Sequence, residues 1–422
     1  MKSHWIAVAL LGSGLTLARD VAADSTPPLN PNDWNFVLVQ SLESDPASGN
    51  NLSVTGLNHA LRLGQLLSSL LSGKQAQVRG VYAFNSADKD GERDMRSLES
   101  IEPYALLNNA SVSVQKLSRG TALQYGSAAY FVGQILANQP SGTYVLSMPA
   151  SMLKDVAKAL TKKVITIQTE HQYFVVAGQP QALAVESFTD GISNVRDYPV
   201  IPLPAPSACR QPAVNFRVRP PKAWKPYTSQ TVHLVRHVEA HPTGSFEDGN
   251  YVCQGQWRAL GANGRLLEKL GGRKPDFVFT SDPSNIIACG ASCSYVRPSL
   301  TVAPFAIQHA LPLTLAPFQW EDATDLAQAL FNRESAYFKH PTNGATILVG
   351  WEHAHIEKAV KYLIETMYED AEAAKRVPSW SFEDYDSIWE LSTDKDGALT
   401  FRNTCEGIAS AALPSTCPAF FQ

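Results

Sequence analysis

The sequence has no basic run and little excess charge of either sign. Lys and Arg number 35 against 39 Asp and Glu, which gives a formal net charge of −4 over 422 residues. Domains that bind nucleic acid usually carry clustered Lys and Arg to neutralise phosphates. The mixed charges therefore argue against nucleic acid as a partner, and 44% apolar with 18% charged residues is typical of a globular protein.

Beyond its first 23 residues the sequence also lacks an apolar run long enough to span a membrane. The first residues contain Lys2 and His4, the apolar stretch WIAVALLGSGLTLA, and small residues up to Ala23. This order is typical of a secretory signal peptide. We therefore expect residues 1–23 to be an export signal, and the mature protein to be secreted or periplasmic with no membrane span.

Cysteine is scarce, but its number is even. Six cysteines suit an oxidising compartment, in which they pair as disulfides. Cys289 and Cys293 are close enough in sequence to bridge, and Cys405 could bridge Cys417, which leaves two others. The sequence does not fix this connectivity. No second cysteine pair has the spacing of zinc ligands, so we do not expect a zinc site there.

The chain contains the same pattern twice. NFVLVQSLES at 35–44 corresponds to TVHLVRHVEA at 231–240, but only the second copy ends in Arg236 and His237. Further segments match in the same order: LSVTGLNHALRLGQLLSSL with LGANGRLLEKL (Gly56 with Gly264), VRGVYAFNS with PDFVFTS, RSLESIEPYA with RPSLTVAPFA, SGTYVLSMPASMLKDVAKAL with NGATILVGWEHAHIEKAVKYL, and ALAVESFTDGI with ALTFRNTCEGI. Six ordered matches indicate a tandem duplication.

Each copy alternates strand-like and helix-like segments and ends in a pattern typical of a β-hairpin. This predicts an α/β fold of two tandem three-layer α/β/α domains, each with a mostly parallel central sheet. The length also fits two domains. We expect their limits at 24–200 and 228–422, joined by a Pro-rich linker at 201–227.

Four charged side chains of the second copy suggest a phosphate pocket. Arg236 and His237 follow one predicted strand, His353 follows another, and Arg297 opens a predicted helix. Ligands of parallel sheets bind beyond the carboxyl ends of the strands. The guanidinium group matches phosphate oxygens in two-point contacts, and an imidazole can attack phosphorus.

These motifs resemble the histidine phosphatase superfamily, whose branches include phosphoglycerate mutases and acid phosphatases. LVRHVE resembles its Arg-His-Gly strand end, RPSLTVAPFA its second-arginine helix, and ILVGWEHAHI its second-histidine strand. The resemblance implies that His237 forms a phosphohistidine, while Arg236, Arg297 and His353 bind the phosphoryl group without a cofactor. Val238 departs from the family, because it places a β-branched residue where glycine usually lets the backbone approach the phosphate.

The proton donor is less well marked. Ala354 follows His353, so the His-Asp dipeptide of the acid phosphatase branch is absent. Glu321 occupies the part of the chain where the mutase branch keeps its glutamate, and we favour it as the general acid. Asp322 and Glu352 are the alternatives, and a helix cap is an equally good explanation of the stretch EDATD.

The first copy lacks the catalytic pattern. Gln40 and Ser41 stand where the second copy has Arg236 and His237, and the strand that ends at VLSMPAS offers no histidine. We therefore expect this copy to be unable to form a phosphohistidine. A structural role, or a role in shaping the entrance to the other copy, is the expected use of this half.

These observations predict an exported phosphatase that hydrolyses a small phosphorylated molecule. The sequence does not determine the oligomeric state of this protein. Two alternatives stay open. One is an exported protein that binds a phosphate ligand without turnover, which Val238 and the unmarked general acid favour. The other is a metal-dependent hydrolase, because imidazoles ligate zinc and histidines cluster in HVEAH and HAH, namely at His237, His241, His353 and His355.

Overall fold

The computed structural model of the chain describes residues 29–73, 77–86, 93–117, 127–241, 248–289, 292–335, 337 and 344–420. The expected export signal at 1–23 lies outside these residues. Within them, no helix combines the length and the apolar character needed to cross a membrane.

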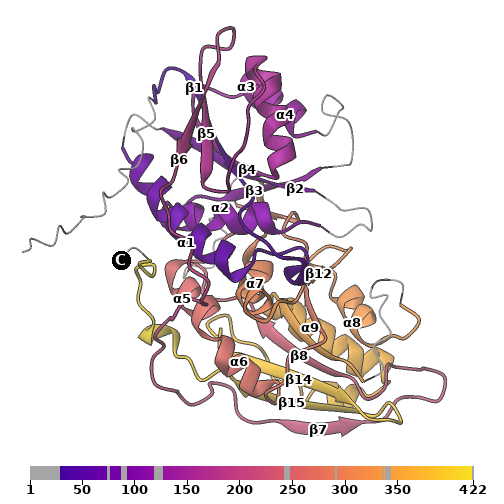
Figure 1. The fold of residues 1–422 in the computed structure, drawn as a ribbon. Coiled ribbons are helices and arrows are strands. Elements are labelled where there is room, and N and C mark those ends of the chain that lie inside the picture. The colour runs from indigo at the N-terminus through magenta and orange to yellow at the C-terminus, as the bar shows by residue number, and fades with distance from the viewer. Residues whose placement is uncertain are drawn as a thin grey trace, which may run out of the picture.

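The N-terminal half contains a six-stranded sheet with the order β3-β2-β4-β1-β5-β6 (Figure 1). The first four strands of this order are parallel, whereas β5 is antiparallel to β1 and forms a hairpin with β6. The strands are β1 (Trp34–Gln40), β2 (Val78–Ser86), β3 (Val112–Leu117), β4 (Gly142–Met148), β5 (Gln172–Gly178) and β6 (Ala184–Thr189).

The C-terminal half contains a seven-stranded sheet with the order β12-β9-β13-β8-β14-β15-β7. Its first four strands are again parallel, and β14, β15 and β7 are antiparallel to their neighbours. The strands are β7 (Asn215–Val218), β8 (Thr231–Arg236), β9 (Phe277–Thr280), β12 (Leu313–Leu315), β13 (Thr346–Trp351), β14 (Ser387–Thr393) and β15 (Leu399–Cys405), and β10 (Ile286–Ala288) with β11 (Ser292–Ser294) forms a separate hairpin.

The two sheets list their strands in the same order when β1 is set against β8. Parallel strands followed by a terminal hairpin are confirmed in both halves. The seventh strand, β7, falls within the stretch 201–227 that the sequence predicts as a linker. Its backbone pairs with β15, so part of this stretch extends the sheet and does not simply connect the halves.

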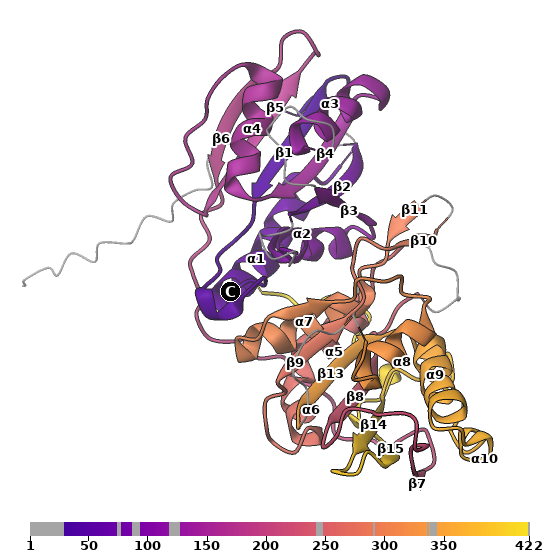
Figure 2. The same cartoon turned by 90° about the vertical axis from the view of Figure 1, so that its right-hand side faces the viewer.

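Helices cover both faces of each sheet (Figures 1 and 2). In the N-terminal half, α1 and α2 lie on one face and α3 and α4 on the other; in the C-terminal half, α5 to α7 lie opposite α8 to α10. The helices are α1 (Val54–Leu70), α2 (Arg96–Leu107), α3 (Ala128–Asn138), α4 (Ala150–Thr161), α5 (Cys253–Gly261), α6 (Asn263–Lys269), α7 (Arg297–His309), α8 (Ala323–Phe331), α9 (His353–Tyr362) and α10 (Ala371–Ala374).

One hydrophobic core runs between the two sheets. α1 and α2 of the N-terminal half lie against α5 and α7 of the C-terminal half (Figure 2). Leu57 and Leu61 on α1 belong to the same buried cluster as Leu260 on α5 and Leu300 on α7. Burial of these side chains joins the two halves, because apolar surface removed from water contributes about 25 cal/mol per Å².

The described cysteines form three disulfides. Cys289–Cys293 is confirmed. The expected Cys405–Cys417 pair is wrong, because Cys405 bonds to Cys209 and Cys417 bonds to Cys253. The sheet explains the first of these bonds: Cys209 precedes β7, and β7 pairs with the strand that ends at Cys405.

Candidate active site

The candidate residues gather beyond the carboxyl ends of neighbouring parallel strands. Arg236 is the last residue of β8 and lies in register with Trp351, the last residue of β13. The backbone N–H of His237 donates to the carbonyl of Trp351 at 2.9 Å. His237 and Glu352, which follow these two strands, therefore begin side by side, as expected for a site at this edge of a parallel sheet.

The ring of His237 is held in one orientation. Its Nδ1 lies 2.8 Å from the carbonyl oxygen of Val238, and because a carbonyl only accepts, the proton must sit on Nδ1. Burial holds the pKa of His237 well below its usual value, and the positive charges of Arg236 and Arg297 lower it further. The ring is therefore neutral at physiological pH with its lone pair on Nε2, the form that can act as a nucleophile.

Val238 is accommodated without filling the site. Its backbone N–H donates to Oγ1 of Thr301 on α7 at 3.0 Å, and Thr301 in turn donates to the carbonyl of Arg297 at 2.8 Å. The valine side chain belongs to the buried core between the sheets. A Cβ added at Gly255 would lie 2.8 Å from Val238 Cγ2, so the absence of a side chain at Gly255 leaves room for the valine.

Arg236 is buried, and the hydrogen bonds of its guanidinium group leave from one nitrogen, Nη1. Its Nη1 donates to the carbonyl oxygens of Ser381, Phe382 and Asp384, and the guanidinium carbon lies 4.0 Å from the ring centre of Tyr385. Within the described residues its Nε has no hydrogen-bond partner. A buried donor without a partner is costly, so this nitrogen suits an anionic ligand.

Arg297, at the start of α7, is oriented by main-chain carbonyls. Its Nε donates to the carbonyl of Asn250 and its Nη2 to that of Asp248, both at 2.6 Å. These two carbonyls fix the direction of the guanidinium group. The positive charge of Arg297 reaches His237, whose pKa it lowers.

A carboxylate lies between two imidazoles at the start of α9. Oε1 of Glu352 contacts Nδ1 of His353, and its Oε2 accepts from Nδ1 of His355 at 2.6 Å and from the backbone N–H of His355 at 2.9 Å. Burial alone would raise the pKa of Glu352, but these partners hold it well below its usual value. Glu352 therefore stays ionised and is poorly suited to donate a proton.

The favoured general acid, Glu321, is exposed. Its neighbour Trp320 lines the site, since the Trp320 ring lies 4.7 Å from Tyr295 and 5.0 Å from His355. Asp322 is also exposed and accepts from the backbone N–H of Gln319 at 3.2 Å, which is a local turn contact. Glu321 thus lies next to the wall of the site, whereas Glu352 lies inside it.

Sequence reasoning missed the aromatic and main-chain groups that complete the site. The rings of Tyr295 and Tyr385 lie 6.2 and 6.0 Å from the His237 ring. The carbonyls of Asp248 and Asn250 hold Arg297. No spacing in the sequence marks these groups, because they come from loops whose distance from His237 only the fold sets.

The corresponding strand end of the N-terminal half carries different chemistry. Oγ of Ser41 lies 2.8 Å from Oγ of Ser97, and Gln40 donates to the carbonyl of Thr169. Arg96 opens α2 as Arg297 opens α7, but it forms a two-point ion pair with Asp94. Arg96 is therefore already neutralised by a carboxylate of its own half.

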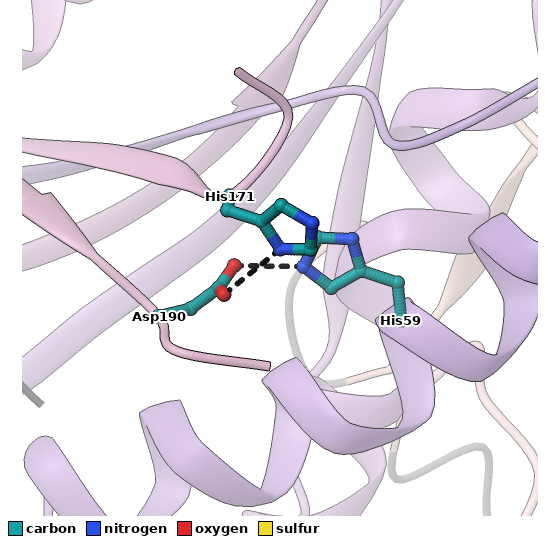
Figure 3. A group of neighbouring side chains, drawn as sticks. All are labelled: His59, His171 and Asp190. Atoms are coloured by element: carbon teal, nitrogen blue, oxygen red, sulfur yellow. Dashed lines mark hydrogen bonds and ion pairs between the residues drawn. The ribbon is translucent and has the colours of Figure 1, made fainter. Parts of the chain in front are cut away.

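The N-terminal half also contains a buried group of titratable side chains (Figure 3). His59 lies 2.7 Å from Asp190 through Nε2 and 2.9 Å from Glu43 through Nδ1, and His171 contacts Asp190 at 3.1 Å. Among the described residues, the ligand atoms of His59, His171 and Asp190 lie within 4.8 Å of one another, close enough to hold a metal ion. The histidines of the alternative metal site, at 237, 241, 353 and 355, do not form such a group within the residues that the structure describes.

The C-terminal half contains the counterpart of this group, and there the central residue is an arginine. Arg258 donates to Glu239 and to Glu406, each at 2.7 Å. A Cβ at Gly56, three residues before His59, would lie 2.1 Å from the carbonyl of Glu43; at Gly255, three before Arg258, it would lie 2.6 Å from that of Glu239.

This close approach corrects the sequence alignment. Gly255, not the predicted Gly264, corresponds to Gly56, since nothing lies within 4 Å of a Cβ added at Gly264. His59 consequently corresponds to Arg258, a permanent cation between two carboxylates. Since both ring nitrogens of His59 face carboxylates, we interpret the group as a buried ion pair around a protonated imidazole, not as a metal centre.

Three solved structures are similar to part of this chain. No family model matches the chain, and no curated protein matches it. A protein histidine phosphatase SixA complexed with tungstate is similar over 37% of this chain and 96% of its own, with 12% identity and a TM-score of 0.28. A phosphoglycerate mutase from Plasmodium falciparum covers 39% of this chain and 94% of its own, with 12% identity and a TM-score of 0.26. A putative phosphohistidine phosphatase SixA from Agrobacterium tumefaciens covers 38% and 90%, with 16% identity and a TM-score of 0.24.

Proposed function

We propose that the C-terminal half hydrolyses a phosphomonoester through a phosphohistidine formed on His237. The observation that carries this proposal is the state of the His237 ring. Its Nδ1 is committed to the carbonyl of Val238, and its charge is suppressed by burial and by Arg236 and Arg297. A neutral imidazole between two buried guanidinium groups is suited to attack an anionic phosphoryl group.

The reaction proceeds in two displacements. The Nε2 lone pair of His237 attacks phosphorus, the bond to the leaving oxygen breaks, and that oxygen takes a proton from the general acid. Water then attacks phosphorus and gives a proton back to the same group. The phosphorus–nitrogen bond breaks, inorganic phosphate leaves, and neutral His237 is restored.

The surrounding cations stabilise the charge on the phosphoryl oxygens during both steps. Arg236 offers its Nε, which has no partner among the described residues, and Arg297 presents a guanidinium group oriented by two carbonyls. His353 joins them from α9, where Glu352 fixes its ring. Because these groups are held before substrate binds, little reorganisation opposes the reaction.

We propose Glu321 as the proton donor. Glu352 is held ionised by two imidazoles, which disfavours it for this role. Asp322 accepts a hydrogen bond from the backbone N–H of Gln319, and this turn contact occupies one of its carboxylate oxygens. Glu321 is exposed beside Trp320 and can therefore meet a leaving group at the entrance of the site.

We further propose that the chain consists of two copies of one domain, at 24–200 and 228–422, and that only the second is catalytic. The shared strand order and the matched pairs Gly56–Gly255 and His59–Arg258 support the duplication. Three disulfides support an oxidising compartment, and hence the proposed export.

Hydrolysis of p-nitrophenyl phosphate by the full chain tests the proposed function. His237→Ala should lower kcat by about a thousandfold or more, because the nucleophile is lost. Acid quenching of the wild type with labelled substrate should trap an acid-labile phosphoenzyme that the variant does not form. His309→Gln is the control, since this half-buried histidine at the end of α7 contacts Phe305 and takes no part in the proposed site.

Equal rates for wild type and His237→Ala would contradict the proposal. Phosphate binding without any turnover would instead identify a binding protein. Loss of activity on chelation, restored by zinc, would favour the metal-dependent alternative.

A further inference from the structure

The segment 381–385, just before β14, carries an exposed aromatic ring at the edge of the proposed phosphate site. The ring centre of Phe382 lies 5.3 Å from the guanidinium carbon of Arg236 and 5.9 Å from the ring centre of His353. Phe382 is nevertheless 45% exposed. One side of its ring therefore faces two proposed phosphate-binding residues while another side faces solvent, which places Phe382 at the rim of the site.

The backbone of this segment is held in place by Arg236. Its Nη1 donates to the carbonyl oxygens of Ser381, Phe382 and Asp384. The carbonyl of Ser381 also accepts from the backbone N–H of Asp384 at 3.0 Å, and that of Asp384 accepts from Nε1 of Trp380 at 2.9 Å. The segment is therefore fixed relative to Arg236 before a substrate binds, and so is the point from which the Phe382 side chain extends.

The other polar groups of the segment are also occupied. The carbonyl of Glu383 accepts from Nη1 of Arg210 at 3.1 Å, and the carboxylate of Asp384 accepts from the hydroxyl of Ser387 and from two backbone N–H groups. Oγ of Ser381 accepts from the backbone N–H of Glu383 at 3.3 Å. These groups are poorly placed to bind the hydroxyls of a substrate, so the segment offers a phenyl ring at the rim.

Two more rings line the inner part of the site. Tyr295 and Tyr385 lie 6.2 and 6.0 Å from the His237 ring. Tyr295 is buried and Tyr385 is half-buried, so Phe382 is the most exposed of the three. Ligand sites are commonly lined by aromatic side chains, with a few polar groups that fix the orientation of the ligand. The arrangement fits a ligand whose phosphoryl group reaches His237 and whose remainder contacts a ring at the rim.

We propose that Phe382 is a specificity-determining residue, and that the site prefers phosphomonoesters whose alcohol part carries an aromatic or extended apolar group. The inference rests on the proposed function, because it assigns a substrate class to the same site. In-line attack by the buried His237 directs the leaving oxygen away from that ring, toward the open end of the site. With phosphorus held by Arg236 and His353, the leaving group passes the Phe382 ring, which lies next to both.

The chemistry of this rim favours an apolar leaving group over a polyol. Packing of an apolar group on the Phe382 ring removes apolar surface of both from water. A polyol would lose hydrogen bonds to water at the same place and gain none from the occupied carbonyls of segment 381–385. The contact is remote from phosphorus and is kept in the transition state, so its effect should appear in kcat/KM.

Hydrolysis of two phosphate esters by the full chain tests this inference. 2-Phenylethyl phosphate and glycerol 3-phosphate both release a primary alcohol, but the first carries a phenyl ring and the second carries hydroxyl groups. The wild type should have a kcat/KM about tenfold higher for 2-phenylethyl phosphate. Phe382→Ala should lower kcat/KM about tenfold for 2-phenylethyl phosphate and at most about twofold for glycerol 3-phosphate.

The variants leave the backbone contact with Arg236 intact. Arg236 binds the main-chain carbonyl of Phe382, so Phe382→Ala removes the ring and keeps this hydrogen bond. Phe382→Tyr keeps an aromatic ring and should stay within about threefold of the wild type on 2-phenylethyl phosphate. Glu383→Ala is the matched control, because Glu383 is the next residue of the segment and its exposed carboxylate pairs with Arg210 at 3.6 Å. It should change the ratio of the two kcat/KM values by less than about twofold.

Calorimetry with inorganic phosphate separates a ring that contacts the leaving group from a ring that only orients Arg236. Phosphate has no leaving group to contact Phe382. Phe382→Ala should therefore bind phosphate within about twofold of the wild type. A loss of phosphate affinity as large as the loss of kcat/KM on 2-phenylethyl phosphate would overturn the specificity role, because the ring would then act through Arg236.

Failure of this inference differs from failure of the proposed function. If His237→Ala abolishes hydrolysis but Phe382→Ala affects the two esters equally, or the wild type does not prefer 2-phenylethyl phosphate, the substrate class is wrong and the proposed function stands. If the wild type hydrolyses neither these esters nor p-nitrophenyl phosphate faster than His237→Ala, the proposed function is wrong and the inference falls with it.

Discussion

At the scale of single residues, the surroundings of Val238 decide whether this valine is compatible with a catalytic site. In sequence it departs from the glycine of the resembling family, which favours a non-catalytic protein. In the structure its side chain enters the core and its N–H is bound by Thr301, with Gly255 leaving space for the methyl groups. The departure is compensated within the fold, so it is a weak reason to doubt turnover.

Glu321 gives a prediction at the same scale. If it protonates the leaving oxygen, Glu321→Gln should lower kcat for an alkyl phosphate about 100-fold, because an alkoxide leaves poorly without a proton. Hydrolysis of p-nitrophenyl phosphate should change little, since nitrophenolate leaves without one. Steady-state kinetics on both substrates make the comparison, with Asp322→Asn as the control. A selective loss in Asp322→Asn or Glu352→Gln instead would move the role to that residue.

At the scale of elements, a buried cation on the first helix of each half binds two carboxylates, one after strand β1 or β8 and one after the hairpin strand β6 or β15. Arg258 on α5 joins Glu239 and Glu406, whereas His59 on α1 joins Glu43 and Asp190. The guanidinium group stays charged at all accessible pH values, but the imidazole does not. The two halves should therefore differ in their response to pH.

We predict that His59→Ala lowers the free energy of unfolding by about 3 kcal/mol at neutral pH, since it leaves two carboxylates without their buried partner. Burial alone would lower the pKa of His59, but Asp190 and Glu43 raise it to about 9. The stabilisation should be complete below the unfolded-state value of 6.5 and disappear as the pH rises through about 9.

Urea unfolding of wild type and His59→Ala on both sides of that window makes the measurement. The difference between the two proteins should shrink at the alkaline end. A difference independent of pH would contradict a protonated imidazole. An unfolding midpoint that rises with added zinc in the wild type but not in the variant would show that the group binds metal instead.

At the scale of the whole molecule, the shared core makes the two halves interdependent. Glu99 and Glu102 are buried in this core, and burial raises the pKa of each from 4.5 to about 8. The folded state therefore binds protons that the unfolded state releases. Stability should fall as the pH rises from about 4.5 to about 8 and then level off for these two groups.

Urea unfolding across this window tests the prediction, with an expected slope of about 1 kcal/mol per pH unit for each acid. Glu99→Gln should remove one share of the slope, because only Glu102 then keeps a pKa raised by burial. An unchanged slope in Glu99→Gln would contradict the assignment of the pH dependence to this core.

Much of the fold could be predicted because strands and helices leave local patterns. Apolar runs such as Phe36–Val39 mark buried strands, and repeated motifs predicted that each copy of the pattern would end in a hairpin. Disulfide partners could not be predicted, since Cys209 meets Cys405 only because β7 joins β15. The helix alignment failed for a related reason: Gly255 corresponds to Gly56 through its approach to a backbone carbonyl, which sequence spacing does not record.

The sequence by itself determined the repeated α/β pattern and the chemical types of Arg236, His237, Arg297 and His353, because side-chain chemistry and strand periodicity are local properties. Only the tertiary structure decided where the side chain of Val238 points and which main-chain carbonyls orient Arg297. The carbonyls that orient Arg297 lie 47 and 49 residues before it, and the core that receives Val238 contains helices of both halves, so only the packed chain brings these groups together.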